Sequence, residues 1–571
     1  MESIATVGYA SQILAALQDG IAAHQRISAP KHGLSEQDMK AITHRLQANS
    51  SHFETEIESG VSPESPVAAI AHDSAQVLND VAAQITSMHV EGQTKKSMLG
   101  RLKLTKKPSS TDLKRINGMK MRLEEPILRL DELLPPLVKD AEGFLEEHIS
   151  LNPVDPVQMK TLYSAAASMR AALCYEAKSS AASAAIQSLA PQIEALIAKL
   201  QQTAALNALK FAKIYERFDS ITTAEANTYA WLLPRDADDA RDLTPPLSQH
   251  LVHAKKSFLD WLRAGSGFFY TSGKPGAGKS TLMKFICRHQ LFHDCASQWA
   301  GDAILVVGRF FFWKPGQTEQ KSISGMLRGL LYSILETQPH LASVALPTFC
   351  DSLITDTVHR ISDADVQGAF QNMLEAFSSS KRHAFMLVID GLDEFDGDHG
   401  ELLTLMQSWV LRYPSTIKIC VSSREYGIFE DFFKDYPKLR LHELTRDDMA
   451  LLIASRFSTS KAFAKLPGRD LESITPLITE RAEGVFLWVI LAISAVEDGM
   501  EAGDIKTANE LEGCVKRFPS ELDDLLLHLH KSVSEFNRPS KSPAFYNRAR
   551  AILAWDSWIL CSSMRRRRHG T

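Results

Sequence analysis

One stretch of the 571-residue chain constrains its fold more than any other. The apolar run at 268–271 leads into GKPGAGKST at 273–281, and apolar residues at helical spacing follow. This order is strand, glycine-rich loop and helix, and the loop matches G-x-x-x-x-G-K-[ST]. Such a loop opens from the end of a buried strand, so the sequence predicts an α/β domain built on a parallel sheet.

The residues of this loop also predict phosphate chemistry. Gly276 and Gly278 let backbone N–H groups converge on phosphate oxygens, and the helix starting near Lys279 directs its positive end at the same anion. We expect Lys279 to reach the β and γ phosphates of a nucleotide, and the Ser280 hydroxyl to ligate Mg²⁺. The residues predicted to bind the nucleotide are Gly273, Lys274, Pro275, Gly276, Ala277, Gly278, Lys279, Ser280 and Thr281.

Short apolar runs alternate with helical stretches from about residue 258 onward, which is typical of βαβ units. The predicted strands lie at 268–271, 304–313, 385–390, 417–421 and 439–441. Apolar residues at helical spacing within 323–335 predict a crossover helix between the second and third strands. We therefore expect a parallel sheet with helices on both faces.

The third predicted strand ends in carboxylates that complete the same site. Residues 384–394 read AFMLVIDGLDE, so Asp390 falls at the carboxyl edge of the sheet, where it would hold the water shell of Mg²⁺. Asp393 and Glu394 follow, and Glu394 is the favoured residue to orient or deprotonate the attacking water. The alternative for these two acids is an exposed helix N-terminus enriched in carboxylates.

The fourth predicted strand ends in Ser422, Ser423 and Arg424. Arg424 would face the γ-phosphate and report its presence. The alternative is a surface salt bridge to Glu425 or Asp431.

A second group of residues has the composition of a zinc site. Cys287, His289, His293 and Cys295 fall in the predicted helix after the loop, where their spacing scatters them around the helix axis. We therefore expect no zinc there.

The segments on either side of this domain differ in character. Residues 1–215 are alanine-rich with helical periodicity, and predict an all-α bundle interrupted by loops at 62–66, 135–136 and 152–156. The predicted divisions are a helical N-terminal domain at 1–215, a lead-in at 216–255, the nucleotide-binding domain at 256–444, a helical subdomain at 445–510, and a last segment at 511–571. The family resemblance given below implies that the first is an effector domain and that the last is the truncated start of a helical or winged-helix module. Thr445 is the expected N-cap of the subdomain's first helix, paired with Asp448 three positions later.

Composition narrows the range of partners and compartments. The 63 Lys and Arg residues against 68 Asp and Glu give a net charge of −5, which does not favour nucleic acid as a partner. A basic cluster within 95–122 is interpreted either as an acidic-membrane contact or as a solvated helix face, and the run at 565–568 as solvated charge. Seven dispersed cysteines and the lack of a long apolar segment predict a reduced, cytoplasmic protein.

Several motifs together resemble the NACHT domains of fungal NOD-like receptors, which are STAND P-loop NTPases and include heterokaryon-incompatibility proteins. The resemblance covers about 222–500 and is carried by GKPGAGKSTLMKFI, FFFWKPGQTEQKSISGMLRGLLYSIL, FMLVIDGLDEF, ICVSSRE and AEGVFLWVILAI. It implies that 273–281 is the Walker A motif, that Asp390, Asp393 and Glu394 form Walker B, and that Arg424 is the sensor arginine. Where related proteins carry a Gly-x-Pro that touches adenine, this chain has Gly484-Val485-Phe486.

The resemblance also implies a function. Members of this family use ATP and ADP with Mg²⁺ as a switch: an ADP-bound closed monomer becomes an ATP-bound form that self-associates, and an N-terminal domain then signals, often toward cell death. Slow ATP hydrolysis would reset the switch. Two alternatives remain open, namely a P-loop ATPase or phosphotransferase whose turnover is itself the function, and a scaffold that binds nucleotide only for stability.

Overall fold

The structure is a computed structural model that describes residues 2–28, 36–57, 65–96, 110–150, parts of 159–170, 181–225, 227–234, 248–352, 361–380 and 382–535. The chain forms two compact units, one of residues 1–207 with 339–360 and the other of 208–338 with 361–571. The two units are described separately.

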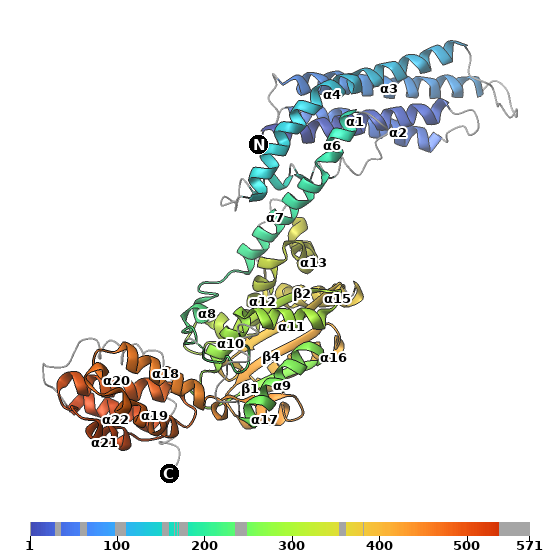
Figure 1. Ribbon diagram of the computed structural model, residues 1–571. Helices are drawn as coiled ribbons and strands as arrows, with labels where there is room; N and C mark the ends of the chain where they lie inside the picture. The colour runs from blue at the N-terminus through green and yellow to red at the C-terminus, as the bar shows by residue number, and fades with distance from the viewer. Residues whose placement is uncertain are drawn as a thin grey trace. The chain divides into compact units, whose positions relative to one another are not determined.

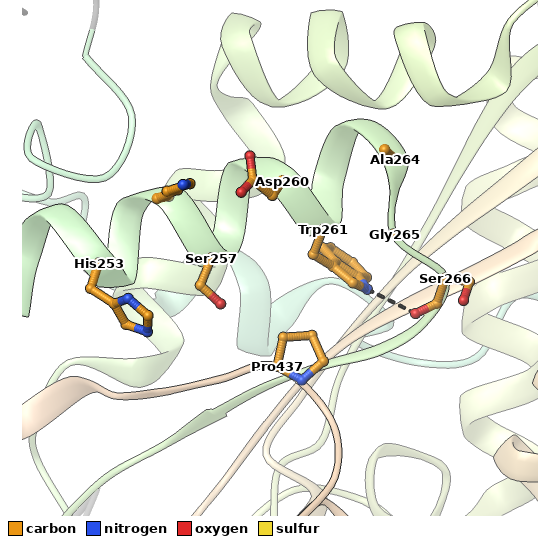
Figure 2. Close-up of a pocket in the computed structure, with 9 residues that line it drawn as sticks. His253, Ser257, Asp260, Trp261, Ala264, Gly265, Ser266 and Pro437 are labelled. Atoms are coloured by element: carbon orange, nitrogen blue, oxygen red, sulfur yellow. Dashed lines mark hydrogen bonds between the residues drawn. The ribbon is translucent and has the colours of Figure 1, made fainter.

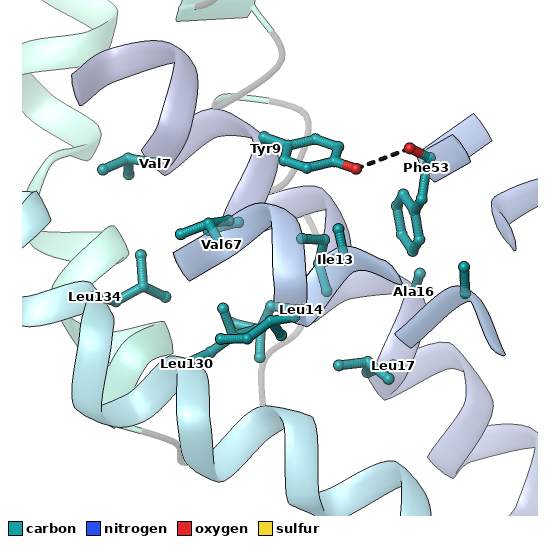
Figure 3. Packing of buried hydrophobic residues seen from close by; sticks show 14 of the residues in the cluster. Val7, Tyr9, Ile13, Leu14, Ala16, Leu17, Phe53, Val67, Leu130 and Leu134 are labelled. Carbon is teal, nitrogen blue, oxygen red and sulfur yellow. Dashed lines mark hydrogen bonds between the residues drawn. The ribbon is translucent and has the colours of Figure 1, made fainter. Parts of the chain in front are cut away.

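The first unit is a bundle of long helices. Its elements are α1 (Glu2–Ser28), α2 (Glu36–Ile57), α3 (Pro66–Lys96), α4 (Ser110–Ser150), α6 (Ala181–Ser188) and most of α7 (Ala190–Leu209), with the short α13 (Ala342–Ala345) and α14 (Pro347–Ser352). Figure 3 shows Ile13, Leu14 and Leu17 of α1 packed among buried residues of the other helices. Tyr9 Oη donates a hydrogen bond to the Phe53 carbonyl at 2.9 Å, which satisfies a buried hydroxyl inside this apolar core. The predicted all-α bundle is confirmed.

The loop predicted at Pro135 and Pro136 is wrong, because both residues lie inside α4. Each proline removes a helical N–H, but Leu130, Leu134 and Val138 remain fully or almost fully buried on one face of the helix. Burial of that face continues through the proline pair and keeps the segment helical.

The second unit contains a five-stranded parallel sheet in the order β2-β3-β4-β1-β5. The strands are β1 (Gly267–Ser272), β2 (Ile304–Phe311), β3 (His383–Asp390), β4 (Ile417–Ser423) and β5 (Lys438–Arg440). All five predicted strands are therefore present, with end shifts of one or two residues, and the predicted fold class is confirmed. Strand β4 lies between β1, which leads into the glycine-rich loop, and β3, which ends at Asp390.

Helices cover both faces of this sheet (Figure 1). Phe269, Met386 and Cys420 on one face pack against α9 (Gln249–Ala264), α10 (Lys279–Arg288) and α11 (Gln290–Ala300). The helices of the other face include the predicted crossover helix, α12 (Ile323–Thr337), with α15 (Asp363–Ser380) and α16 (His399–Arg412). Gly329 lets α12 approach the sheet closely, because a Cβ there would lie 2.5 Å from the Phe310 ring.

A helical subdomain follows the sheet. It comprises α18 (Arg446–Thr459), α19 (Gly468–Ala482), α20 (Phe486–Ala502), α21 (Ala508–Arg517) and α22 (Leu522–Glu535), and one apolar cluster runs through all five helices. Thr445 stands at the N-cap position of α18, but its side chain makes no capping hydrogen bond. Asp448 is buried and accepts hydrogen bonds from Tyr229 N at 3.2 Å and Trp231 Nε1 at 2.9 Å, so the predicted capping pair is wrong.

Several predictions concern residues outside the described part of the chain. They are the acidic lead-in at 236–246, the loop at 152–156, most of the loop at 62–66, the basic residues at 101–107, Cys174, Cys561 and the arginines at 565–568. Among the described helices, none combines the length and the hydropathy that a membrane span requires.

Candidate nucleotide-binding site

The glycine-rich loop joins the end of β1 at Ser272 to the start of α10 at Lys279. Gly276 and Gly278 have φ of +73° and +88°, values that disfavour residues with a Cβ. A Cβ at Gly276 would also lie 2.8 Å from Leu487 Cβ, and one at Gly278 would lie 2.5 Å from Tyr229 Oη. Both glycines are therefore required by backbone conformation and by close neighbours.

Lys279 extends back over this loop. Its Nζ donates hydrogen bonds to the carbonyls of Gly273 at 2.8 Å and Lys274 at 3.1 Å. Burial lowers the pKa of Lys279, and the nearby charge of Asp393 opposes this effect. The ammonium thus lies between the loop and the carboxylates that follow β3, which is the predicted position for a group that contacts phosphate.

Asp390 ends β3 and is completely buried. Its Oδ1 accepts a hydrogen bond from Ser422 Oγ on β4, while Oδ2 is buried without a hydrogen-bond partner among the described residues. Burial raises the pKa of Asp390, and the positive charge of Arg217 opposes that rise. A buried carboxylate oxygen without a hydrogen-bond partner is a suitable ligand for a hydrated divalent cation.

Asp393 and Glu394 lie in the short 3₁₀ helix Leu392–Glu394 and have different partners. Asp393 pairs with Arg424, at 3.0 Å between Oδ2 and Nε, and also accepts the Arg424 backbone N–H. Glu394 Oε2 accepts the Lys314 N–H at 3.0 Å, while Oε1 lies 3.7 Å from Arg217 Nη2. Burial raises the pKa of Glu394, and Arg217 opposes the rise. The alternative of exposed acids is wrong for Asp393, whose side chain is only 4% exposed.

Arg217 is the site residue that the sequence analysis missed. It lies in the short helix α8 (Glu216–Ser220), and its Nη2 is 3.4 Å from Ser280 Oγ. The same segment brings Tyr229 to the loop, where its hydroxyl donates to the Gly278 carbonyl at 3.2 Å. No motif marks Arg217, since its place depends on a contact across 63 sequence positions.

The helical subdomain also contacts the loop. Leu487 N, in the first turn of α20, donates to the Gly276 carbonyl at 3.2 Å, and Lys274 forms an ion pair with Glu483 at 2.7 Å. Gly484 has φ +83°, and a Cβ there would lie 1.9 Å from the His442 carbonyl oxygen. The Gly484-Val485-Phe486 segment is thus in contact with both the sheet domain and the loop.

A pocket away from this site lies at the opposite edge of the sheet. Figure 2 shows it between α9 and the segments that enter β1 and β5, with Trp261, Ser266 and Pro437 among its lining residues. Gly265 and Ser266 precede β1, and Pro437 precedes β5, so the pocket lies at the amino ends of these strands. The loop, Asp390 and Arg424 lie at the carboxyl ends, where open α/β sheets bind ligands.

The residues that resemble a zinc set fall on two helices. The helix after the loop ends at Arg288, so the prediction that all four lie in it is wrong. His289 caps α11 by accepting the Leu291 N–H at 3.2 Å, and His293 Nε2 lies 3.0 Å from the Cys287 carbonyl oxygen. These contacts give both histidines roles in local structure.

Comparisons with known proteins match part of this chain to one family. Residues 249–424, from α9 to the end of β4, match a family described as nephrocystin 3, N-terminal. The fold is that of a P-loop NTPase. No curated protein matches the chain. A solved structure, described as Drosophila ORC bound to DNA, aligns at 11% identity over 64% of this chain and 83% of that one. The TM-score of this alignment is 0.31.

Proposed function

We propose that this chain is an ATP/ADP-dependent signalling switch of the NACHT/STAND type. The observation that carries the proposal is the contact of two further segments with the phosphate-binding loop. Leu487 of the helical subdomain donates to Gly276 O, and Tyr229 of the lead-in donates to Gly278 O. A ligand bound at the loop therefore has direct neighbours in both of the segments that a switch must move.

The chemistry of the site fits a nucleotide with Mg²⁺. The positive-φ glycines, the N-terminus of α10 and the Lys279 ammonium favour bound phosphate groups. Ser280 and the unpaired oxygen of Asp390 would hold Mg²⁺, whose charge would offset that of the phosphates. Glu394, with its raised pKa, would orient or deprotonate water, and Arg424 would respond to the γ-phosphate if it exchanged Asp393 for that group.

A switch also needs an energetic difference between its two nucleotide states. A change from 1:99 to 99:1 between two conformations requires about 5.5 kcal/mol of differential binding. Contacts between the loop and the helical subdomain could differ between the two nucleotide states and so supply this energy. The Lys274–Glu483 pair and the Leu487–Gly276 hydrogen bond are two such contacts. In our proposal, ADP is compatible with these contacts and ATP weakens them.

The downstream part of the proposal follows the resemblance to fungal NACHT proteins. Opening leads to self-association in the cytoplasm, and the N-terminal bundle relays the signal in innate immunity or incompatibility. Contact of this bundle with an acidic membrane is one form that the output would take. Slow hydrolysis of ATP resets the switch.

Light scattering on the purified full chain tests this function. The molar mass is measured with ADP, with a non-hydrolysable ATP analogue, and for Lys279→Ala under both conditions. We expect a monomer with ADP, a larger assembly with the analogue, and no response of the variant to either nucleotide. Rapid ATP turnover by a monomer would instead indicate an ATPase or phosphotransferase, and an unchanged mass with bound nucleotide would indicate a scaffold.

A further inference from the structure

The nucleotide site contains a cation that no recognised motif supplies. Arg217 Nη2 lies 3.4 Å from Ser280 Oγ and 3.7 Å from Glu394 Oε1, and its side chain is only 14% exposed. Ser280 is a predicted ligand of Mg²⁺, and Glu394 is the acid predicted to act on water. The Arg217 guanidinium therefore lies next to Ser280 and Glu394, which would also lie close to a bound Mg²⁺ ion.

The acidic residues of the site divide between two arginines. Asp393 pairs with Arg424. Glu394 lies beside Arg217, whose Nη2 is also within 3.4 Å of Ser280 Oγ, the hydroxyl predicted to hold Mg²⁺ together with Asp390. Arg217 and a metal held by Ser280 and Asp390 would therefore compensate the same negative charge.

Packing around α8 holds Arg217 at this position. Phe218, the next residue, is buried against the Phe311 ring at 5.0 Å between centroids. Lys284 Nζ donates to the carbonyls of Asp219 and Ile221, which ties the end of α8 to α10. Arg309 and Arg288 stack over the Phe218 ring at 4.7 and 5.3 Å. These contacts fix the backbone of Arg217 without involving its guanidinium.

We propose that Arg217 stands in for the metal: it neutralises the acidic part of the site when Mg²⁺ is absent, so that nucleotide binds even without the metal. This inference rests on the proposed nucleotide-binding function. An unneutralised Asp390 and Glu394 would repel the phosphates of an entering nucleotide. With Arg217 in place that repulsion is reduced, and with Mg²⁺ bound the contribution of Arg217 becomes redundant.

Titration calorimetry with ADP on the full chain tests this inference, in excess Mg²⁺ and again in excess EDTA. The measured quantity is the ratio of the Kd in EDTA to the Kd in Mg²⁺. For Arg217→Gln we expect this ratio to rise about tenfold over wild type, since one lost charge interaction of this kind corresponds to that change in affinity. Arg217→Lys keeps the charge and is expected to keep most of the wild-type ratio.

Arg288→Gln is the matched control, because it removes an arginine that contacts α8 by lying over the Phe218 ring. Its ratio is expected to equal that of wild type. A Kd that rises equally in both conditions for Arg217→Gln would make Arg217 a phosphate-binding residue and overturn the inference. An unchanged ratio with unchanged affinity would overturn it as well. Failure of the wild type to bind ADP in either condition would instead reject the proposed function.

Discussion

Asp393 holds Arg424 at two points: its Oδ2 lies 3.0 Å from Arg424 Nε, and its Oδ1 accepts the Arg424 backbone N–H at 3.0 Å. The carboxylate is 4% exposed and the guanidinium side chain 20%. The pair therefore links the turn after β3 to the end of β4 at the carboxyl edge of the sheet, next to the phosphate-binding loop.

Removing the Arg424 guanidinium is expected to destabilise the sheet domain. Arg424→Gln leaves the Asp393 carboxylate buried without its cation, and such a loss costs roughly 3 kcal/mol. The measurement is the free energy of unfolding in urea. The double variant Asp393→Asn/Arg424→Gln removes both charges and is expected to recover more than half of the lost stability.

The exposed pair formed by Arg440 and Glu425 provides the comparison. Its Nε–Oε1 distance is 2.8 Å, but Arg440 is 48% exposed, so Arg440→Gln is expected to cost less than about 1 kcal/mol. Equal losses for Arg424→Gln and Arg440→Gln would contradict the importance assigned to the buried pair.

Lys279→Ala is expected to weaken nucleotide binding at least about 100-fold, because the loop would lose its charge-assisted contact with phosphate. Lys274→Ala in the same loop is the control. Lys274 belongs to the predicted nucleotide-binding loop through its backbone N–H, while its side chain pairs with Glu483 and the two side chains are 38% and 48% exposed. We therefore expect loss of the Lys274 side chain to change ADP affinity less than about threefold. Calorimetry with ADP measures both, and comparable losses would mean that the two lysines do not have the distinct roles assigned to them.

The sequence was sufficient to predict the strands and the residues at their ends, because these depend on local patterns of apolar residues. Strands β1 to β4 are largely apolar runs of six to eight residues, and the residue at the end of such a run lies at an edge of the sheet, so Asp390 could be placed from spacing alone. Arg217 and Asp448 could not, because their contacts span 63 and 217 to 219 positions and no motif signals them. The loop predicted at Pro135 and Pro136 was wrong for another reason. Helix propensity is a weaker influence on this segment than the burial of Leu134 and Val138.

Gly484→Ala is expected to disturb the junction between the sheet domain and the helical subdomain. The residue has φ +83°, and an added Cβ would lie 1.9 Å from the His442 carbonyl oxygen, so both the backbone and its neighbour must shift. We expect a clear fall in the melting temperature and easier proteolysis near the junction.

Gly301→Ala separates the effect of backbone strain from the effect of the steric clash. Gly301 also has a positive φ, +60°, but no atom lies within 4 Å of its added Cβ. Its cost should be limited to backbone strain, about 1–3 kcal/mol. The interpretation fails if Gly484→Ala lowers the melting temperature no more than Gly301→Ala does.

The contact of Asp448 with Tyr229 and Trp231 is expected to make the free energy of unfolding depend on pH. Burial raises the pKa of this carboxyl to about 7, against the opposing hydrogen bonds from Trp231 Nε1 and Tyr229 N. The folded state therefore binds more protons than the unfolded state between about pH 4 and pH 7, so the free energy of unfolding falls as pH rises through this window.

Asp448→Asn keeps an acceptor oxygen and removes the charge. Its advantage over wild type should grow from pH 5 to pH 8, up to roughly 4 kcal/mol. Urea unfolding across this range provides the measurement, with exposed Asp435→Asn as the control that should retain the wild-type profile. A constant difference between Asp448→Asn and wild type at all pH values would show that Asp448 is already ionised throughout.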